Sequence, residues 1–188
     1  MVTCKQDPDK DYPSDMSNFK EELRKVEAFI FDVDGVLSCQ TMTLHPDGEP
    51  MRTINIKDGY ALQLAVKKSY PIAIITGGTS NSVRKRFERL GIKDIYLNSS
   101  EKKDDLHDFI GKYQISPSAI LYMGDDLPDL EPMQLVGFPT CPADAVVEIK
   151  QISRYISNYN GGEGCVRDVI EQVLRLHNKW MDTDAYHW

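Results

Sequence analysis

Residues 26–35 read VEAFIFDVDG, an apolar run of strand length that ends in two aspartates and a glycine. Alternate residues of a strand point to the same side, so Asp32 and Asp34 are expected to project together from its carboxyl end. Ligands of open α/β sheets bind at that edge. Adjacent carboxylates repel each other, and a divalent cation relieves the repulsion. Taken alone, the motif fits a metal site and a simple acidic cap of the strand equally well.

Short apolar runs alternate with helical patterns along the rest of the chain. Runs that are apolar throughout are typical of strands buried on both faces of a parallel sheet. The alternation predicts right-handed crossovers and a three-layer α/β/α sandwich with a mainly parallel sheet. The predicted strands span residues 26–31, 71–75, 95–97, 120–123, 136–139 and 154–156. The predicted helices span residues 58–69, 80–90, 101–113, 129–135, 143–152 and 165–180.

One segment interrupts this alternation directly after the first predicted strand. Residues 38–57 contain two β-type runs, 41–44 and 51–56, on either side of the turn sequence PDGEP. Such turn chemistry predicts a β-hairpin inserted as a flap. The expected organisation is a flexible arm over residues 1–20, a single domain over residues 21–180 that includes the hairpin, and a tail over residues 181–188.

The composition is that of a net acidic globular domain. The chain has 188 residues with 22 basic and 29 acidic side chains, a formal charge of −7. This balance disfavours a nucleic-acid partner, because such binding depends on Lys and Arg. No membrane association or secretion is expected, since no apolar run approaches the roughly 20 residues that span a bilayer and the N-terminus is polar. Four widely spaced cysteines predict reduced thiols in a cytoplasmic protein.

Three further predicted strands also end in residues that suit a phosphoryl group. Thr76 and Gly77 follow the second strand, Lys102 opens the helix after the third, and the sequence Gly124-Asp125-Asp126 follows the fourth. Each motif also has a purely structural interpretation. Thr76 and Gly77 fit a strand–helix turn, Lys102 fits a solvated charge, and the aspartates after the fourth strand, Asp129 included, fit a helix N-cap. Parallel strands bring all four ends to one edge, however. The joint set then combines a nucleophile, an acid–base group, metal ligands and cations, which favours phosphoryl-transfer chemistry.

The order of these motifs resembles the haloacid dehalogenase superfamily, and the lack of a long insertion resembles its capless branch. The first motif matches residues 32–35, and the others match Thr76, Lys102 and residues 124–126. The resemblance implies a Mg²⁺-dependent phosphotransferase fold. It further implies that Asp32 is the nucleophile and forms an aspartyl-phosphate, while Asp34 is the general acid and base.

Roles for the other motif residues follow from the same resemblance. The carboxylates of Asp32 and Asp125 and the backbone carbonyl of Asp34 would hold Mg²⁺, with Asp126 supporting it through a water. The residues that would hold the phosphoryl oxygens or offset their charge are Thr76, Gly77 and Lys102.

Within that branch the sequence is similar to the family of 3-deoxy-D-manno-octulosonate 8-phosphate phosphatases over roughly residues 26–176. The segments FDVDGVLS, NIKDGYAL, AIITGG and NGGEGCVRD carry this similarity. It implies hydrolysis of that sugar-acid phosphate for lipopolysaccharide precursors, by a homotetramer whose hairpins form a central barrel and whose tail 161–167 reaches a neighbouring site. The substrate contacts that it implies are Asp34, Asn55, Ile56, Lys57, Asp58, Gly59, Gly77, Arg86 and Lys102.

Two positions depart from the family pattern. Gly78 and Gln63 stand where the pattern has arginine, and a lost guanidinium removes a bidentate anion contact. A nine-carbon keto-deoxy sugar acid 9-phosphate, of the KDN or N-acylneuraminate type, is therefore an alternative substrate. More remote alternatives are a non-catalytic tetramerisation module, which need not keep the acids, and a phosphoacceptor receiver domain, whose acceptor aspartate follows the third strand.

Overall fold

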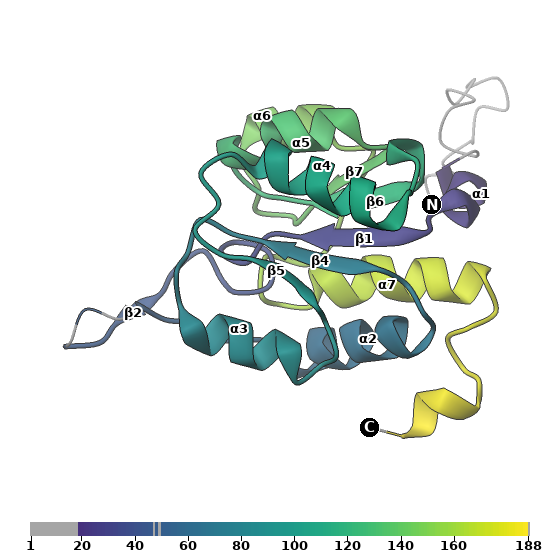
Figure 1. Ribbon diagram of the computed structural model, residues 1–188, viewed down its shortest axis with the longest axis horizontal. Coiled ribbons are helices and arrows are strands. Elements are labelled where there is room, and N and C mark those ends of the chain that lie inside the picture. The colour runs from purple at the N-terminus through teal and green to yellow at the C-terminus, as the bar shows by residue number, and fades with distance from the viewer. Residues whose placement is uncertain (1–18, 47, 49, 188) are drawn as a thin grey trace, which may run out of the picture.

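Six parallel strands form the central sheet of the computed structural model, which describes residues 19–46, 48 and 50–187. The strand order is β5-β4-β1-β6-β7-β8, so the strand that comes first in the sequence lies inside the sheet (Figure 1). Every neighbouring pair is parallel, which confirms the predicted α/β class. The strands are β1 Ala28–Phe31, β4 Ile72–Ile75, β5 Asp94–Tyr96, β6 Ile120–Met123, β7 Phe138–Cys141 and β8 Tyr155–Ile156.

Strand β1 is buried on both faces, as its unbroken apolar sequence predicts. Phe29 and Phe31 pack into the core on one face of the sheet, and Ala28 and Ile30 pack into the core on the other. All four residues are inaccessible to solvent. The direction of β1 therefore fixes where the chain leaves the sheet, and that point is the acidic sequence at residues 32–35.

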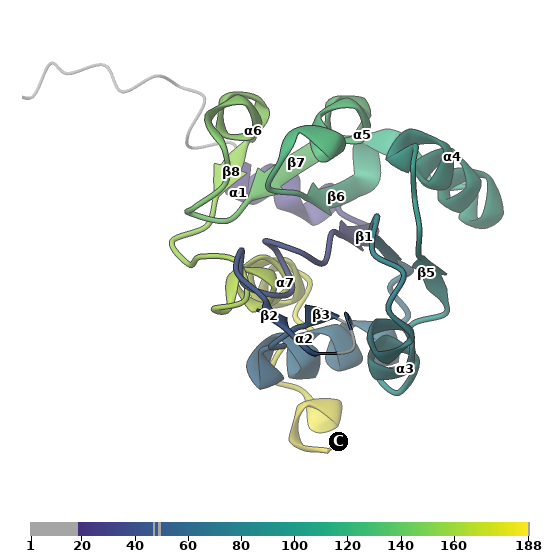
Figure 2. The ribbon, with the colours of Figure 1, turned by 90° about the vertical axis from the view of Figure 1, so that its left-hand side faces the viewer.

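Helices cover both faces of the sheet and complete three layers. The end-on view shows α2, α3 and α7 on one side and α4, α5 and α6 on the other (Figure 2). The apolar side chains of each group belong to the core cluster of the face that it covers. The helices are α1 Phe19–Glu22, α2 Ile56–Lys67, α3 Asn81–Glu88, α4 Lys102–Tyr113, α5 Leu130–Leu135, α6 Val147–Ile152 and α7 Cys165–Leu176. The 3₁₀ turns are η1 Leu23–Lys25, η2 Pro117–Ala119, η3 Leu127–Asp129 and η4 Thr183–Tyr186.

The predicted hairpin is present, but its strands are shorter than the sequence pattern indicates. Strands β2 Thr43–Leu44 and β3 Pro50–Met51 pair antiparallel and extend away from the body (Figure 1). The second run was expected to continue to residue 56, but α2 begins at Ile56. The side chain of Asn55 causes this early start, because its Oδ1 accepts a hydrogen bond from Lys57 N at 2.8 Å and caps the helix.

Helix α7 ends earlier than its apolar periodicity predicts. The expected helix runs to residue 180, but α7 stops at Leu176, and Asn178 takes a left-handed conformation with φ 57°. Trp180 then folds back and is buried against the core, so its apolar character reflects packing rather than helix continuation. Beyond it, Tyr60 Oη donates a hydrogen bond of 2.5 Å to the carbonyl of Ala185, which ties the C-terminal segment to α2.

Helix α6 begins later than predicted, at Val147 instead of residue 143. The preceding residue, Val146, has an extended backbone, and its N–H donates to the carbonyl of Asp125 at 3.0 Å. This bond holds the segment before α6 against the loop that follows β6.

The predicted arm lies largely in residues 1–18, outside the described residues, and its last two positions begin α1. No helix within the described residues is long and apolar enough to cross a membrane.

Candidate active site

The loop after β1 brings its acidic residues against the loop after β6. Asp32 N–H donates to the carbonyl of Met123 at 3.1 Å, which continues the strand pairing beyond the sheet. Gly35 follows with φ 90°, a conformation that L side chains rarely adopt. A Cβ at this position would lie 1.9 Å from Asp125 Oδ2. Glycine is therefore required here for two reasons, the backbone turn and the approach of the Asp125 carboxylate.

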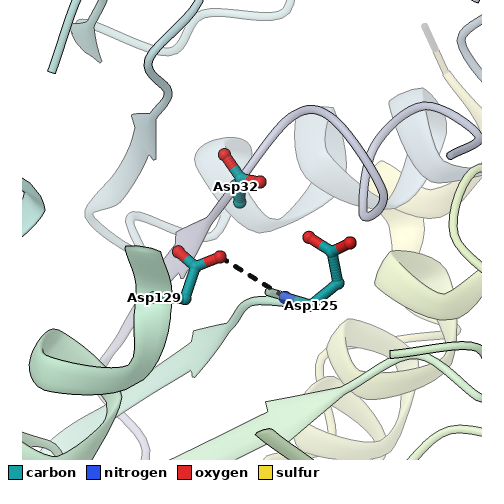
Figure 3. Close-up of side chains that lie close together, drawn as sticks. All are labelled: Asp32, Asp125 and Asp129. Atoms are coloured by element: carbon teal, nitrogen blue, oxygen red, sulfur yellow. Dashed lines mark hydrogen bonds between the residues drawn. The ribbon is translucent and has the colours of Figure 1, made fainter. Parts of the chain in front are cut away.

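Three buried carboxylates meet at this edge of the sheet: Asp32, Asp125 and Asp129 (Figure 3). One oxygen of each lies within 4.8 Å of the others, and the three residues are between 1% and 7% exposed. Burial and the charge of Asp129 raise the pKa of Asp32 to about 7, although Lys102 opposes the shift. Burial and the charges of Asp32 and Asp129 raise the pKa of Asp125 to about 8. The cluster thus holds more negative charge than its surroundings balance.

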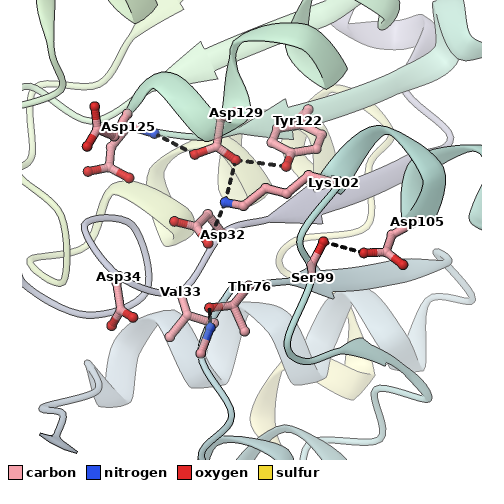
Figure 4. A network of polar contacts seen from close by, with 12 residues as sticks. Asp32, Val33, Asp34, Thr76, Ser99, Lys102, Asp105, Tyr122, Asp125 and Asp129 are labelled. Carbon is pink, nitrogen blue, oxygen red and sulfur yellow. Dashed lines mark hydrogen bonds and ion pairs between the residues drawn. The ribbon is translucent and has the colours of Figure 1, made fainter.

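Lys102 provides the cation inside this cluster. Its Nζ lies 2.9 Å from Asp32 Oδ1 and 2.8 Å from Asp129 Oδ1 (Figure 4). Burial alone would lower the pKa of Lys102, but the charges of the two aspartates outweigh it and raise the pKa above the usual range. Asp129 also accepts a hydrogen bond of 2.8 Å from Tyr122 Oη, so its carboxylate fixes the ammonium beside the nucleophile predicted at Asp32.

Asp126 and Asp129 both line the cavity, but they differ in burial and in hydrogen-bond partners. Asp126 is exposed, and its Oδ1 accepts from Leu127 N at 2.8 Å, which caps η3; its support of a metal through a water stays a prediction. Asp129 was read as a possible cap, yet it is 1% exposed and accepts from Lys102. The turn of η3 causes the difference, because it directs the residue four positions after Asp125 back toward the site. That spacing of four is the signal that could have identified Asp129.

The ends of β4 and β5 form the opposite wall of the site. Thr76 Oγ1 accepts a hydrogen bond from Gly78 N at 3.1 Å, so the loop after β4 is tightly turned. Ser99 and Ser100 follow β5 and also line the cavity; they were not predicted, although they lie two and three positions after a predicted strand. The cavity has a volume of about 590 Å³. Its lining residues are Asp32, Asp34, Gly35, Gln40, Thr76, Gly77, Gly78, Ser99, Ser100, Lys102, Asp125, Asp126, Pro128, Asp129 and Val146.

Asp34 also lines this cavity, and its carboxylate is held by an arginine. Arg52 Nε and Nη2 donate to Asp34 Oδ1 and Oδ2 at 2.5 and 2.8 Å. Ser38 Oγ adds a weaker bond of 3.2 Å to Asp34 Oδ1. The sequence gives no signal for Arg52, because this residue follows β3 of the hairpin and reaches Asp34 only in the folded chain.

Six of the implied substrate contacts lie away from the cavity within one chain. They are found at the start of α2 and on α3, and none of the six is among the described residues that line the cavity. Asp58 is fully buried, and its Oδ1 accepts from Arg167 N at 2.7 Å. Burial raises the pKa of Asp58 to about 6, although the Arg167 N–H opposes this. The six residues, whose contact with substrate stays a prediction, are Asn55, Ile56, Lys57, Asp58, Gly59 and Arg86.

The predicted tail segment 161–167 packs on the loop after β1 of its own chain. Gly161 N donates to Asp144 Oδ1 at 2.9 Å, and Gly162 N donates to the carbonyl of Val36 at 2.8 Å. A Cβ at Gly161 would lie 1.9 Å from the carbonyl oxygen of Gly35. Glycine at 161 therefore permits direct contact between the two backbones. Whether the segment also reaches a neighbouring subunit stays a prediction.

Comparison with known proteins agrees with this geometry. Residues 84–170 match the model of the haloacid dehalogenase-like hydrolase family. The 3-deoxy-D-manno-octulosonate 8-phosphate phosphatases of Salmonella typhi and Escherichia coli K12 are each 34% identical over 158 residues, which is 84% of this chain and 84% of theirs.

Solved structures agree as well. The phosphatase of Yersinia pestis has 31% identity and a TM-score of 0.82, covering 85% of this chain and 86% of its own. The phosphatase of Moraxella catarrhalis, solved with magnesium, phosphate and KDO, has 32% identity and a TM-score of 0.82, covering 87% of this chain and 94% of its own. This chain therefore belongs to the haloacid dehalogenase-like hydrolases, within the family of 3-deoxy-D-manno-octulosonate 8-phosphate phosphatases.

Proposed function

We propose that this protein is a Mg²⁺-dependent phosphomonoesterase that hydrolyses 3-deoxy-D-manno-octulosonate 8-phosphate to the free sugar acid and phosphate, for lipopolysaccharide precursor synthesis. The observation that carries the proposal is the buried group Asp32, Asp125 and Asp129 with Lys102 at the end of β1. The relatives reported above are named for the eight-carbon substrate, so the nine-carbon alternative is not favoured. The retained acids and lysine also disfavour a non-catalytic module.

The residues of the cluster fit a magnesium ion. Mg²⁺ prefers oxygen ligands, and two carboxylates here have pKa values raised by burial and by mutual repulsion. The carboxylates of Asp32 and Asp125 and the backbone carbonyl of Asp34 would hold the ion. Bound there, Mg²⁺ would neutralise charge between the nucleophile and the phosphoryl group. Asp129 is better suited to hold Lys102, since both of its oxygens already accept hydrogen bonds.

The first half-reaction transfers the phosphoryl group to Asp32. A carboxylate oxygen of Asp32 attacks phosphorus and forms an aspartyl-phosphate, while the bond from phosphorus to the sugar oxygen breaks. Asp34 gives its proton to that oxygen, because a sugar alkoxide is a poor leaving group. Thr76 and the Gly77 N–H hold phosphoryl oxygens, and the permanent charge of Lys102 stabilises them.

The second half-reaction regenerates the enzyme. Asp34, now ionised, takes a proton from a water molecule as that water attacks the phosphorus of the aspartyl-phosphate. The bond between phosphorus and the Asp32 oxygen breaks, and inorganic phosphate leaves. Asp34 is suited to both steps because it lies at the cavity mouth with its side chain 34% exposed, whereas Asp32 is buried.

The assembly and location of the enzyme are part of the proposal. The hairpin carries exposed apolar side chains, with Leu44 75% and Met51 49% exposed, which supports burial of hairpins against one another in a homotetramer. Cys39, Cys141 and Cys165 are free thiols, consistent with a cytoplasmic enzyme. Residues 21–180 would form the single domain, with neither nucleic acid nor membrane as a partner.

Phosphate release from a panel of sugar-acid phosphates tests the proposal. Purified protein is incubated with eight- and nine-carbon substrates, with Mg²⁺ or with EDTA. We expect Mg²⁺-dependent release that is fastest for 3-deoxy-D-manno-octulosonate 8-phosphate, and its loss in Asp32→Asn. Asp104→Asn is the matched control, because Asp104 is exposed in the first turn of α4. Faster turnover of a nine-carbon substrate would change the assigned substrate, and an active Asp32→Asn variant would remove the assigned nucleophile.

A further inference from the structure

The guanidinium of Arg52 forms a two-pronged pair with the carboxylate of Asp34. Nε contacts Oδ1 at 2.5 Å and Nη2 contacts Oδ2 at 2.8 Å, so each oxygen has its own donor. The Arg52 side chain is only 8% exposed. Such bidentate pairs are stronger and more directional than a single hydrogen bond. They fix the plane of the carboxylate, which one bond from Ser38 at 3.2 Å would not do.

The same guanidinium packs against the loop after β4. A Cβ at Gly78 would lie 3.0 Å from Arg52 Nη2 and 3.4 Å from Thr76 Oγ1. A side chain at position 78 would therefore press on the arginine, whereas glycine leaves room for it. Arg52 thus lies between Asp34 and the loop that carries Thr76, although Arg52 itself comes from the hairpin.

We propose that Arg52 is a positioning residue that orients Asp34 for proton transfer to the leaving oxygen of the substrate. This inference rests on the proposed function, in which Asp34 is the general acid. An ionised carboxylate has about four lone-pair sites, and the guanidinium uses one on each oxygen, so a remaining site can carry the proton. A proton carried at another site passes to the sugar alkoxide as the bond to phosphorus breaks. Asp34 is then left as a carboxylate, and the charge of Arg52 balances it.

A comparison of two leaving groups tests this role. A sugar alkoxide needs a proton as it departs, but p-nitrophenolate is a much weaker base and departs without one. General acid catalysis contributes roughly 10²–10⁴-fold. We therefore expect Arg52→Met to lower kcat/KM for 3-deoxy-D-manno-octulosonate 8-phosphate by about 30-fold or more, and kcat/KM for p-nitrophenyl phosphate by less than about threefold. Arg52→Lys should lose less on the sugar phosphate, since it keeps the charge.

The control is Arg89→Met, which removes an exposed arginine at the end of α3 and should leave both rates near the wild-type values. The ratio of the two rates does not depend on the folded fraction, so partial unfolding of Arg52→Met would not imitate the expected result. Equal losses on both substrates would show that Arg52 only anchors the hairpin and would overturn the inference. A wild-type protein that hydrolyses neither substrate would instead refute the proposed function, before any variant is compared.

Discussion

The buried aspartates predict that the metal-free protein loses stability as the pH rises from 6 to 8. Burial raises the pKa of Asp32 to about 7 and of Asp125 to about 8, from a value of 3.8 for an exposed aspartate. Between pH 6 and pH 8 the folded protein therefore binds more protons at Asp32 and Asp125 than the unfolded chain does. Stability falls with rising pH wherever the folded state holds the extra protons. The free energy of unfolding is therefore higher at pH 6, where the cluster is protonated, than at pH 8, where its carboxyls ionise.

The size of the effect follows from the two pKa values. Near pH 6 both carboxyls are mostly protonated in the folded state, and near pH 8 one is ionised and the other is half ionised. Each proton that only the folded state binds contributes about 1.4 kcal/mol per pH unit. Together the two groups lower the free energy of unfolding by on the order of 4 kcal/mol between pH 6 and pH 8. Saturating Mg²⁺ would keep both carboxylates ionised throughout and remove this decline.

Urea unfolding at pH 6, 7 and 8, with EDTA or with excess Mg²⁺, measures the effect. Groups elsewhere in the chain contribute equally to both series, so the difference between them isolates the cluster. In EDTA, Asp125→Asn should show a shallower pH dependence than the wild type, because one of the two groups is gone. The reasoning is refuted if the two wild-type series have the same pH dependence, or if stability in EDTA rises toward pH 8.

One glycine and one tryptophan give further predictions. Gly35→Ala places a Cβ against the Asp125 carboxylate at a φ of 90°, and we expect it to weaken Mg²⁺ activation roughly 10- to 100-fold; an unchanged Mg²⁺ titration of phosphate release would contradict the close approach. Trp180→Ala removes a ring that is 4% exposed and packs edge-on against Tyr60 at 6.0 Å, and we expect a loss of about 3 kcal/mol in urea unfolding. Retention of wild-type stability would show that the C-terminal segment contributes little to the core.

The fold and the centre of the site could be predicted because local sequence decides both. Residues 26–31, before Asp32, are apolar apart from Glu27. A strand that is buried on both faces requires a continuous apolar run of this kind. Once the strands are parallel, the residues that follow them must share an edge, which places Asp125 near Asp32 without any knowledge of packing. Lys102 follows by the same rule, because it opens the helix after β5.

Features that depend on packing could not be predicted in this way. The start of α2 depends on the Asn55 cap, and the end of α7 depends on the turn at Asn178. Both Asp126 and Asp129 suit a cap equally well by residue type. Only the course of η3 decides which of them enters the cluster.

Gly78 shows how a departure from a family pattern can be read once the fold is known. From the sequence, the missing arginine at this position removes a bidentate anion contact and bears on the specificity for the sugar acid, not on the phosphate chemistry. In the structure, the guanidinium of Arg52 stands beside Gly78 and binds Asp34. A guanidinium from the hairpin therefore stands beside position 78, but two of its donors are already bound to the Asp34 carboxylate. The second departure, Gln63, has no such counterpart that the structure explains. A change at one position is thus weak evidence against a function until the surrounding side chains are known.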